Sequence, residues 1–149
     1  MAELNPLEAA LAALLEDVQP LPGERLACER AAGRVLAEAV TARLDVPPFD
    51  NSAMDGYALH HEDAGRWLTV SQRITAGATG GPLAAGTCAR IFTGGAMPPG
   101  ADCVVMQECV EVQGDRVRVP AEIPAGDNVR RRGRDVAAGQ ALLPAGESL

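Results

Sequence analysis

The apolar positions near the N-terminus recur at the spacing of one helical turn, which is the pattern of an amphipathic helix. The residues on this stripe are Leu7, Leu11, Leu14, Leu15 and Val18. Asn5 can cap the helix, Pro6 fits its first turn, and Glu8 can reach back as in a capping box. Because Pro20 and Gly23 follow shortly, we expect the helix to end before them.

Two weaker patterns follow this helix. Arg25–Cys28 is compatible with a short strand, and Glu29–Ala37 is compatible with a second helix. Gly33 weakens that second helix by about 1 kcal/mol relative to Ala. The first part of the chain, residues 1–40, is therefore predicted to be a helical segment.

From Thr41 onward the pattern changes to short apolar runs between turn formers. Pro47–Pro48 exclude a regular helix, and Asp55–Gly56 marks a turn. The expected strands are Tyr57–His60, Trp67–Ile74, Thr87–Phe92, Cys103–Gln107, Val110–Val112 and Arg116–Val119. Gln113–Asp115 predicts a hairpin between the last two. We therefore predict an α+β fold, mainly β with N-terminal helices, whose β-rich module covers residues 41–140.

The last residues resemble the start of another element. Gly139–Gly146 is an apolar strand that opens into a turn shortly before Leu149. Because a domain rarely finishes as it enters a new element, we expect residues 141–149 to begin a further part of a longer, truncated chain.

Composition narrows the class of protein. A hydrophobic share of 47% and a charged share of 22% are typical of a soluble globular domain. No apolar run reaches the length of a bilayer span, and the N-terminus lacks the layout of a signal peptide, so we expect a cytoplasmic protein that binds no membrane. The net charge of -7 argues against nucleic-acid binding.

The cysteines and histidines carry no metal-site spacing. Cys28, Cys88, Cys103 and Cys109 lack a CxxC arrangement and sit in apolar surroundings, so we predict buried free thiols. His60–Glu62 lacks the spacing of a zinc-binding helix and is interpreted as a solvated loop.

Three loop segments, residues 45–57, 90–102 and 128–135, hold polar side chains next to prolines and glycines. Such loops can place a reactive group with little reorganisation. Asp50 and Asp55 offer the oxygen ligands that Mg²⁺ prefers. Thr93–Gly95 can offer backbone N–H groups and a hydroxyl to an oxyanion. The arginines of Arg130–Arg134 match phosphate or another anion.

Each of these patterns also has an ordinary structural explanation. Aspartates commonly cap turns, a Thr-Gly-Gly sequence is usually a plain loop, and arginine runs are usually solvated faces. Spacing alone therefore supports only a cytosolic β-rich domain with an anion site.

Taken together and in this order, the segments resemble the MoeA family, which includes the gephyrin E domain. Asp45–Ala58 is similar to the family's hallmark N-terminal stretch. Arg90–Gly94 with Met97–Glu108 is similar to its second motif, and Asn128–Asp135 to its third. Gly139–Gly146 fits the segment after it. The resemblance covers nearly the whole chain and implies a molybdopterin molybdenumtransferase.

The resemblance implies a fold, a partner and a reaction. The family's N-terminal region is an irregular β module of coiled and bifurcated sheets packed with helices. In the family's homodimer, this module faces the pterin-binding domain of the other subunit. The family inserts molybdate into adenylylated molybdopterin and hydrolyses the adenylyl link with Mg²⁺.

Asp55, Thr93 and Asp135 sit where the family's motifs carry functional residues. The resemblance implies that Asp55 and Asp135 hold Mg²⁺ or position water, and that Thr93 hydrogen-bonds a substrate oxygen. The predicted substrate or anion contacts are Ser52, Gly94, Arg130, Arg131 and Arg132. The structural alternatives are that Asp55 only caps its turn and that Asp135 only pairs with Arg131 or Arg132.

Two departures from the family's pattern bear on activity. In Thr93–Ala96 a glycine stands where the family more often has alanine, which we expect to add loop freedom. The Ser/Gly-rich pterin motif and the lysines of the family's larger domain are absent, so we do not expect this chain alone to turn over. Two other functions stay open: a gephyrin-like scaffold or partner-binding module, and an anion-binding β domain built on Arg130–Arg134.

Overall fold

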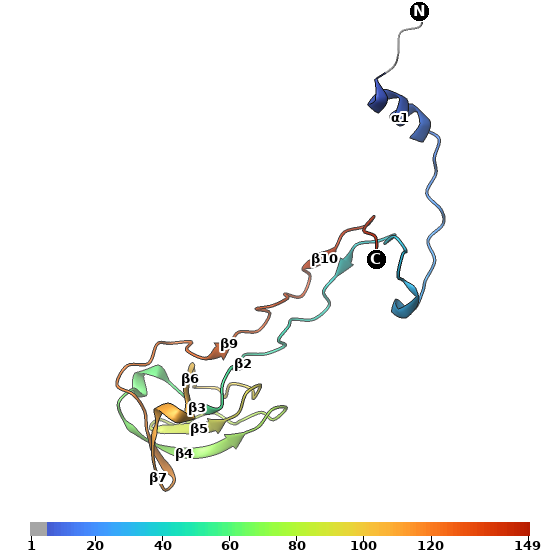
Figure 1. The fold of residues 1–149 in the computed structure, drawn as a ribbon. Coiled ribbons are helices and arrows are strands. Elements are labelled where there is room, and N and C mark those ends of the chain that lie inside the picture. Colours follow the sequence, from blue (N-terminus) through green and yellow to red (C-terminus); the bar gives the residue numbers. More distant parts are fainter. Residues whose placement is uncertain (1–5) are drawn as a thin grey trace, which may run out of the picture. The chain divides into compact units, whose positions relative to one another are not determined.

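The computed structural model describes residues 6–149, which separate into two compact units (Figure 1). One unit comprises the residues up to Ala39 together with Pro144–Leu149, and the other comprises Val40–Leu143. Each unit has its own elements. Among the described residues, no helix combines the length and the apolar character that a bilayer crossing requires.

The predicted N-terminal helix is present as α1, Leu7–Leu15. It ends before Val18, since Glu16 takes the C-cap position, and Pro6 stands at the N-cap. The capping role of Asn5 lies outside the described residues. Leu7 and Leu14 are 82% and 76% exposed, so the described residues of this unit do not cover the apolar stripe.

The strand at Arg25–Cys28 and the helix at Glu29–Ala37 were wrong predictions. Cys28–Arg30 forms a single turn of 3-10 helix, η1. Beyond it, Gly33 takes a φ of 75° and donates its N–H to the carbonyl of Leu149 at 2.8 Å. The following residues pair with the C-terminal segment as far as Gly146, so a distant partner overrides the local helical preference.

The second unit contains a six-stranded sheet, and each of its strands lies at one of the expected positions. Its strands, in spatial order, are β6 (Cys103–Met106), β3 (Gly56–Leu59), β5 (Thr87–Ile91), β4 (Trp67–Ile74), β8 (Arg116–Arg118) and β7 (Glu111–Gln113). Only β4 and β5 run parallel, and β7 and β8 form the predicted hairpin. The mainly β class is therefore confirmed, with one α-helix among the described residues; the bifurcated sheets stay a prediction.

Two short antiparallel ladders extend the second unit. β1 (Val40–Thr41) pairs with β10 (Ala141–Leu143), and β2 (Asn51–Ser52) pairs with β9 (Val129–Arg130). An isolated bridge joins Val46 to Val136 between them, so the two segments run side by side (Figure 1). β10 lies inside the predicted Gly139–Gly146 strand, whereas the other three strands were not predicted.

The core divides between the two faces of the six-stranded sheet, because neighbouring strand residues point to opposite sides. Leu59, Leu68 and Val117 lie in one cluster, and Ala58 and Ile91 lie in the other. Single 3-10 turns, η2 (His61–Asp63) and η3 (Gln107–Cys109), follow β3 and β6.

All four cysteines are free. Cys88 and Cys103 are buried in the core, as predicted. Cys28 and Cys109 are exposed, so the prediction of buried thiols was wrong for these two. Both exposed cysteines lie in 3-10 turns, and neither turn has a buried face.

Candidate functional site

Asp55 and Thr93 meet at the end of two neighbouring strands. Gly56 opens β3 opposite Ile91 at the end of β5, so the residues just outside this pair come together. One oxygen of Asp55, Oδ1, accepts both the backbone N–H and the hydroxyl of Thr93, each at 2.8 Å. Within the part of the chain that the structure describes, Oδ2 accepts no hydrogen bond. Asp55 is therefore held by one oxygen and open at the other.

The position of Asp55 depends on the close approach of β3 and β6. A Cβ on Gly56 would lie 2.0 Å from the carbonyl oxygen of Val105. Only glycine fits at that contact. The carbonyl of Asp55 also accepts the N–H of Gln107 at 3.1 Å, so both sides of the residue are fixed.

Hydrogen bonds keep the Asp55 carboxylate ionised. The backbone N–H of Thr93 contributes most to lowering the pKa of Asp55, and the Thr93 hydroxyl and the charge of Arg90 add to it. Arg90 is anchored in turn, since its guanidinium donates to the carbonyls of Gly56 and Ile91 and to the side chain of Gln107. The carboxylate is thus preset as an anion near a fixed positive charge.

Sequence reasoning missed the groups around Asp55. Arg90 also lies over the rings of Tyr57 and Phe92, at 5.3 and 4.4 Å from their centroids. The Gln107 amide donates to Glu108 at 3.0 Å and lowers the pKa of that carboxyl. Arg90 and Gln107 both stand within the quoted second motif, but Tyr57 belongs to β3 and Gln107 to η3, so the fold brings these residues together.

The Thr-Gly-Gly loop does not form the predicted substrate nest. The Thr93 N–H donates to Asp55, the Gly94 N–H to Ser52 O at 2.9 Å, and the Gly95 N–H to Phe92 O at 2.8 Å. The protein's own carboxylate occupies the place expected for an oxyanion. Gly94 is therefore a structural residue with a φ of 81°.

The loop is also tighter than expected from its glycines. A Cβ on Gly95 would lie 2.9 Å from Phe92 O and 3.0 Å from a side-chain carbon of Ile91. Neighbouring chain fills the space of a side chain at Gly95, which gives this glycine a packing reason; the added loop freedom stays a prediction.

Ser52 has a structural role as well. It is fully buried in β2, and its hydroxyl donates to Met54 O at 2.5 Å and accepts the Met54 N–H at 3.3 Å. Its backbone N–H donates to Gly95 O at 3.0 Å. The Ser52 hydroxyl is buried and its proton is already donated to Met54 O, which favours a structural role; the predicted substrate contact of Ser52 stays a prediction.

Arg131 and Arg132 bind carboxylates of the opposite segment. Arg131 Nη1 lies 2.7 Å from Asp50 Oδ2, and Arg132 Nε lies 2.5 Å from Asp45 Oδ2. Backbone N–H groups of Arg132 and Ala138 complete the two carboxylates, each at 2.8 Å. These backbone bonds contribute most to lowering the pKa values of Asp50 and Asp45. Both arginines therefore cross-link the two segments of the ladder.

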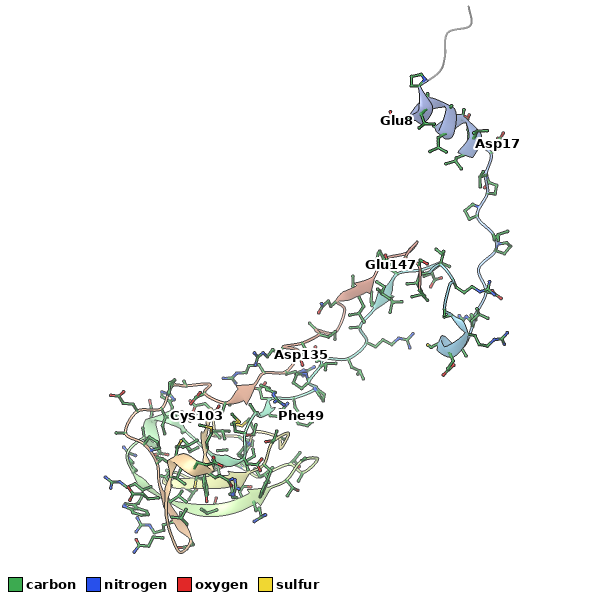
Figure 2. All side chains as sticks on the ribbon, in the orientation of Figure 1. Glu8, Asp17, Phe49, Cys103, Asp135 and Glu147 are labelled. Carbon is green, nitrogen blue, oxygen red and sulfur yellow. The ribbon has the colours of Figure 1, made fainter. Side chains whose placement is uncertain are left out.

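Arg130 and Asp135 remain open toward solvent. Arg130 lies in β9 and, within residues 6–149, belongs to no ion pair. Figure 2 shows Asp135 and Phe49 on the two paired segments. The backbone N–H of Asp135 donates to Val46 O at 2.9 Å, whereas its exposed carboxylate binds neither Arg131 nor Arg132 among the described residues. Asp135 shares no hydrogen-bond partner with Asp55 there.

Comparisons with known proteins identify one family. The model of one protein family, described as the MoeA N-terminal region (domain I and II), matches residues 5–149. The chain is 38% identical over 149 residues to a molybdopterin molybdenumtransferase of Haemophilus influenzae, covering 96% of this chain and 37% of that protein. A molybdopterin molybdenumtransferase of Nostoc sp. is 42% identical over 127 residues, with 80% of this chain and 29% of that protein covered.

A solved structure shares the fold. The crystal structure of a molybdopterin biosynthesis moeA protein from Pyrococcus horikoshii OT3 superposes with a TM-score of 0.83 at 35% identity. The match covers 96% of this chain and 40% of that protein. The chain thus spans about two-fifths of the length of this relative and of the Haemophilus one.

Proposed function

Because this chain belongs to the MoeA N-terminal family, we propose that it is part of a molybdopterin molybdenumtransferase and that Asp55 serves its reaction. The observation that carries the proposal is the Asp55 carboxylate, fixed through one oxygen by Thr93 and open at the other. A group that is already oriented and ionised needs little reorganisation when substrate arrives. The proposed reaction inserts molybdate into adenylylated molybdopterin and hydrolyses the adenylyl link.

The open oxygen of Asp55 suits a hard cation such as Mg²⁺. Carboxylate oxygens are the ligands that Mg²⁺ prefers, and the lowered pKa keeps Asp55 in its binding form at neutral pH. Asp135 offers a second exposed carboxylate. When bound, Mg²⁺ supplies positive charge that offsets the charge developing on the phosphoanhydride.

In this proposal, the residues of this chain have separate roles. Thr93 is a positioning residue, because its hydroxyl hydrogen and its N–H are both directed at Asp55. Arg90 holds the strand ends in place and keeps a positive charge near the carboxylate. Arg130 is left as the substrate or anion contact, since Arg131 and Arg132 already bind aspartates.

The complete enzyme is proposed to be a cytoplasmic homodimer. The exposed apolar stripe of α1 supports an association of this kind, since leucines in water cost free energy that a partner's surface recovers. The substrates are small molecules, as the names of the relatives indicate for those proteins.

The test is a chimera in which this chain replaces the matching part of the Haemophilus influenzae relative. With adenylylated molybdopterin, molybdate and Mg²⁺, we expect release of AMP and formation of the molybdenum cofactor. The relative without this segment serves as the baseline. A chimera that unfolds at the same denaturant concentration as the relative, binds substrate and yet stays at the baseline contradicts the proposal.

The anion-binding alternative predicts a different result. A module built on Arg130–Arg134 binds molybdate in the isolated chain, which calorimetry detects as heat. We expect no heat at millimolar molybdate, because two of the arginines are engaged in ion pairs. Saturable heat that Arg130→Gln abolishes favours the binding module over the enzyme.

A further inference from the structure

We propose that His60, His61 and Asp102 form a binding site for one first-row transition-metal ion, with Zn²⁺ as the physiological candidate. The chain has two histidines, and they are adjacent. One ligand atom from each of the three side chains lies within 4.8 Å of the others. Among the described residues, this is the one group of three or more such side chains that comes together so closely.

The sheet brings the three residues together. Leu59, the last residue of β3, pairs with Cys103, the first residue of β6. His60 directly follows Leu59 and Asp102 directly precedes Cys103, so the two residues come close together. The backbone N–H of Asp102 donates to Leu59 O at 3.0 Å, and the N–H of His61 donates to Asp102 Oδ1 at 2.8 Å. The first bond fixes the backbone of Asp102 and the second fixes its carboxylate before any ion binds.

Both imidazoles face the other oxygen of that carboxylate. Asp102 Oδ2 lies 2.5 Å from His61 Nδ1 and 3.8 Å from His60 Nε2, and the two rings stack with their centroids 4.9 Å apart. Zinc bonds of about 2.0–2.1 Å in a tetrahedron separate ligand atoms by roughly 3.3 Å. To bind zinc, the distance from Asp102 Oδ2 to His61 must lengthen and the distance to His60 must shorten, each by less than about 1 Å. Small rotations of these half-exposed rings allow both changes.

The ligand chemistry selects the class of ion. Two imidazole nitrogens and one carboxylate oxygen suit borderline ions such as Zn²⁺, Co²⁺ and Ni²⁺, whereas Mg²⁺ and Ca²⁺ require oxygen ligands. His60 Nδ1 accepts the backbone N–H of Glu62 at 3.4 Å, and Glu62 Oε2 lies 3.9 Å from the same nitrogen. Metal binding at Nε2 requires the ring proton to move to Nδ1, which can then donate to the Glu62 carboxylate after a small rotation. The neighbouring Cys103 thiol is no ligand, because it is buried and burial raises its pKa to about 12.

The ligand set also suits the charge of a divalent ion. Metal binding requires both imidazoles to be neutral and the Asp102 carboxyl to be ionised, so the three ligands bring one negative charge to the cation. Three protein ligands leave a position for water, which is the arrangement of an open zinc site. This site shares no residue with the proposed site at Asp55.

The imidazole signals of the full chain test the proposal. Cys28 and Cys109 are first changed to serine, since exposed thiols bind the same ions. On titration with Zn²⁺ we expect one ion per chain and shifts of imidazole nitrogen resonances from both histidines. Co²⁺ should broaden the same signals and give visible absorption that Zn²⁺ displaces.

Variants assign the ligands. His60→Gln and His61→Gln should each weaken Zn²⁺ binding about tenfold or more, while the exposed turn variant Asp115→Asn leaves it unchanged. Unmoved imidazole signals at saturating Zn²⁺, or equal Zn²⁺ affinity in a folded His60→Gln chain, overturn the proposal. If a variant does not fold, the signals of the chain with both histidines decide, because that measurement needs neither histidine variant.

Discussion

At the scale of single residues, the account depends on the hydrogen bonds between Thr93 and Asp55. Thr93→Val removes the hydroxyl and keeps the backbone N–H, so the pKa of Asp55 should rise toward its ordinary value without reaching it. Thr69→Val, at an exposed position of β4, is the control. The measurement is the carboxyl carbon signal of Asp55 followed by NMR across an acid titration. Equal pKa values in both variants contradict the contact.

The cysteines give a second prediction at this scale. Cys28 and Cys109 should react rapidly with a thiol reagent in the native chain, because they are exposed. Cys88 and Cys103 should react only after unfolding, since burial raises the pKa of each thiol to about 12 and excludes the reagent. Counting labelled thiols by mass before and after denaturation checks this. Fast labelling of all four thiols in the native chain would contradict the burial of Cys88 and Cys103 in the core.

Residue types alone could not assign the site. The sequence motifs predicted Asp55, Thr93 and Asp135 as functional residues of one site. Among these three, the structure shows a hydrogen-bonded contact only between Asp55 and Thr93. The bond between Asp55 and Thr93 spans 38 residues of sequence, and no local pattern encodes it. For the same reason the aspartate partners of Arg131 and Arg132 were not foreseen, and the structure shows these arginines as cross-links.

At the scale of elements, β3 must lie close to β6 for Asp55 to take its place. Gly56→Ala should lower the free energy of unfolding by about 1–3 kcal/mol or more, because its Cβ would meet the carbonyl of Val105 at 2.0 Å. Gly81→Ala is a matched control, since its Cβ would point into open space and its φ is not positive. Urea denaturation measures both. Equal stability of the two variants contradicts the packing of these strands.

The ladder of β2 and β9 depends on ionised aspartates. Asp45 and Asp50 have lowered pKa values in the folded chain, so their ionised forms stabilise it above the ordinary Asp pKa of about 3.9. That stability should fall as the pH decreases from about 5 through the lower folded values. Asp50→Asn should flatten this dependence, and Asp115→Asn should not. The free energy of unfolding measured at several acid pH values decides, and identical slopes contradict the ladder.

The regular strands were predictable and the irregular ones were not. β3 to β8 alternate or carry apolar runs long enough to show a period, and the expected positions agree with the structure within one or two residues. β1, β2 and β9 are two residues long and exist through partners far away in the chain. The failed helix at Glu29–Ala37 has the same cause, because its residues pair with the C-terminal segment.

At the scale of the whole molecule, the chain corresponds to part of the length of its relatives. It belongs to the MoeA N-terminal family and spans about two-fifths of the relative from Pyrococcus horikoshii. Its motif loops gather on the second unit, where Asp55 is held with one oxygen open. The remaining contacts to pterin and nucleotide are proposed to come from outside this chain, so activity has to be measured in a chimera that contains both parts.

The most direct test is the turnover of Asp55→Asn in the chimera with the Haemophilus influenzae relative. The amide keeps the size of the side chain and can still accept from Thr93, but it loses the charge that Mg²⁺ requires. We predict a loss of about a hundredfold or more at saturating Mg²⁺, the scale at which positioned catalytic groups act, with Asp115→Asn unchanged. Undiminished turnover of a folded Asp55→Asn chimera would contradict the account.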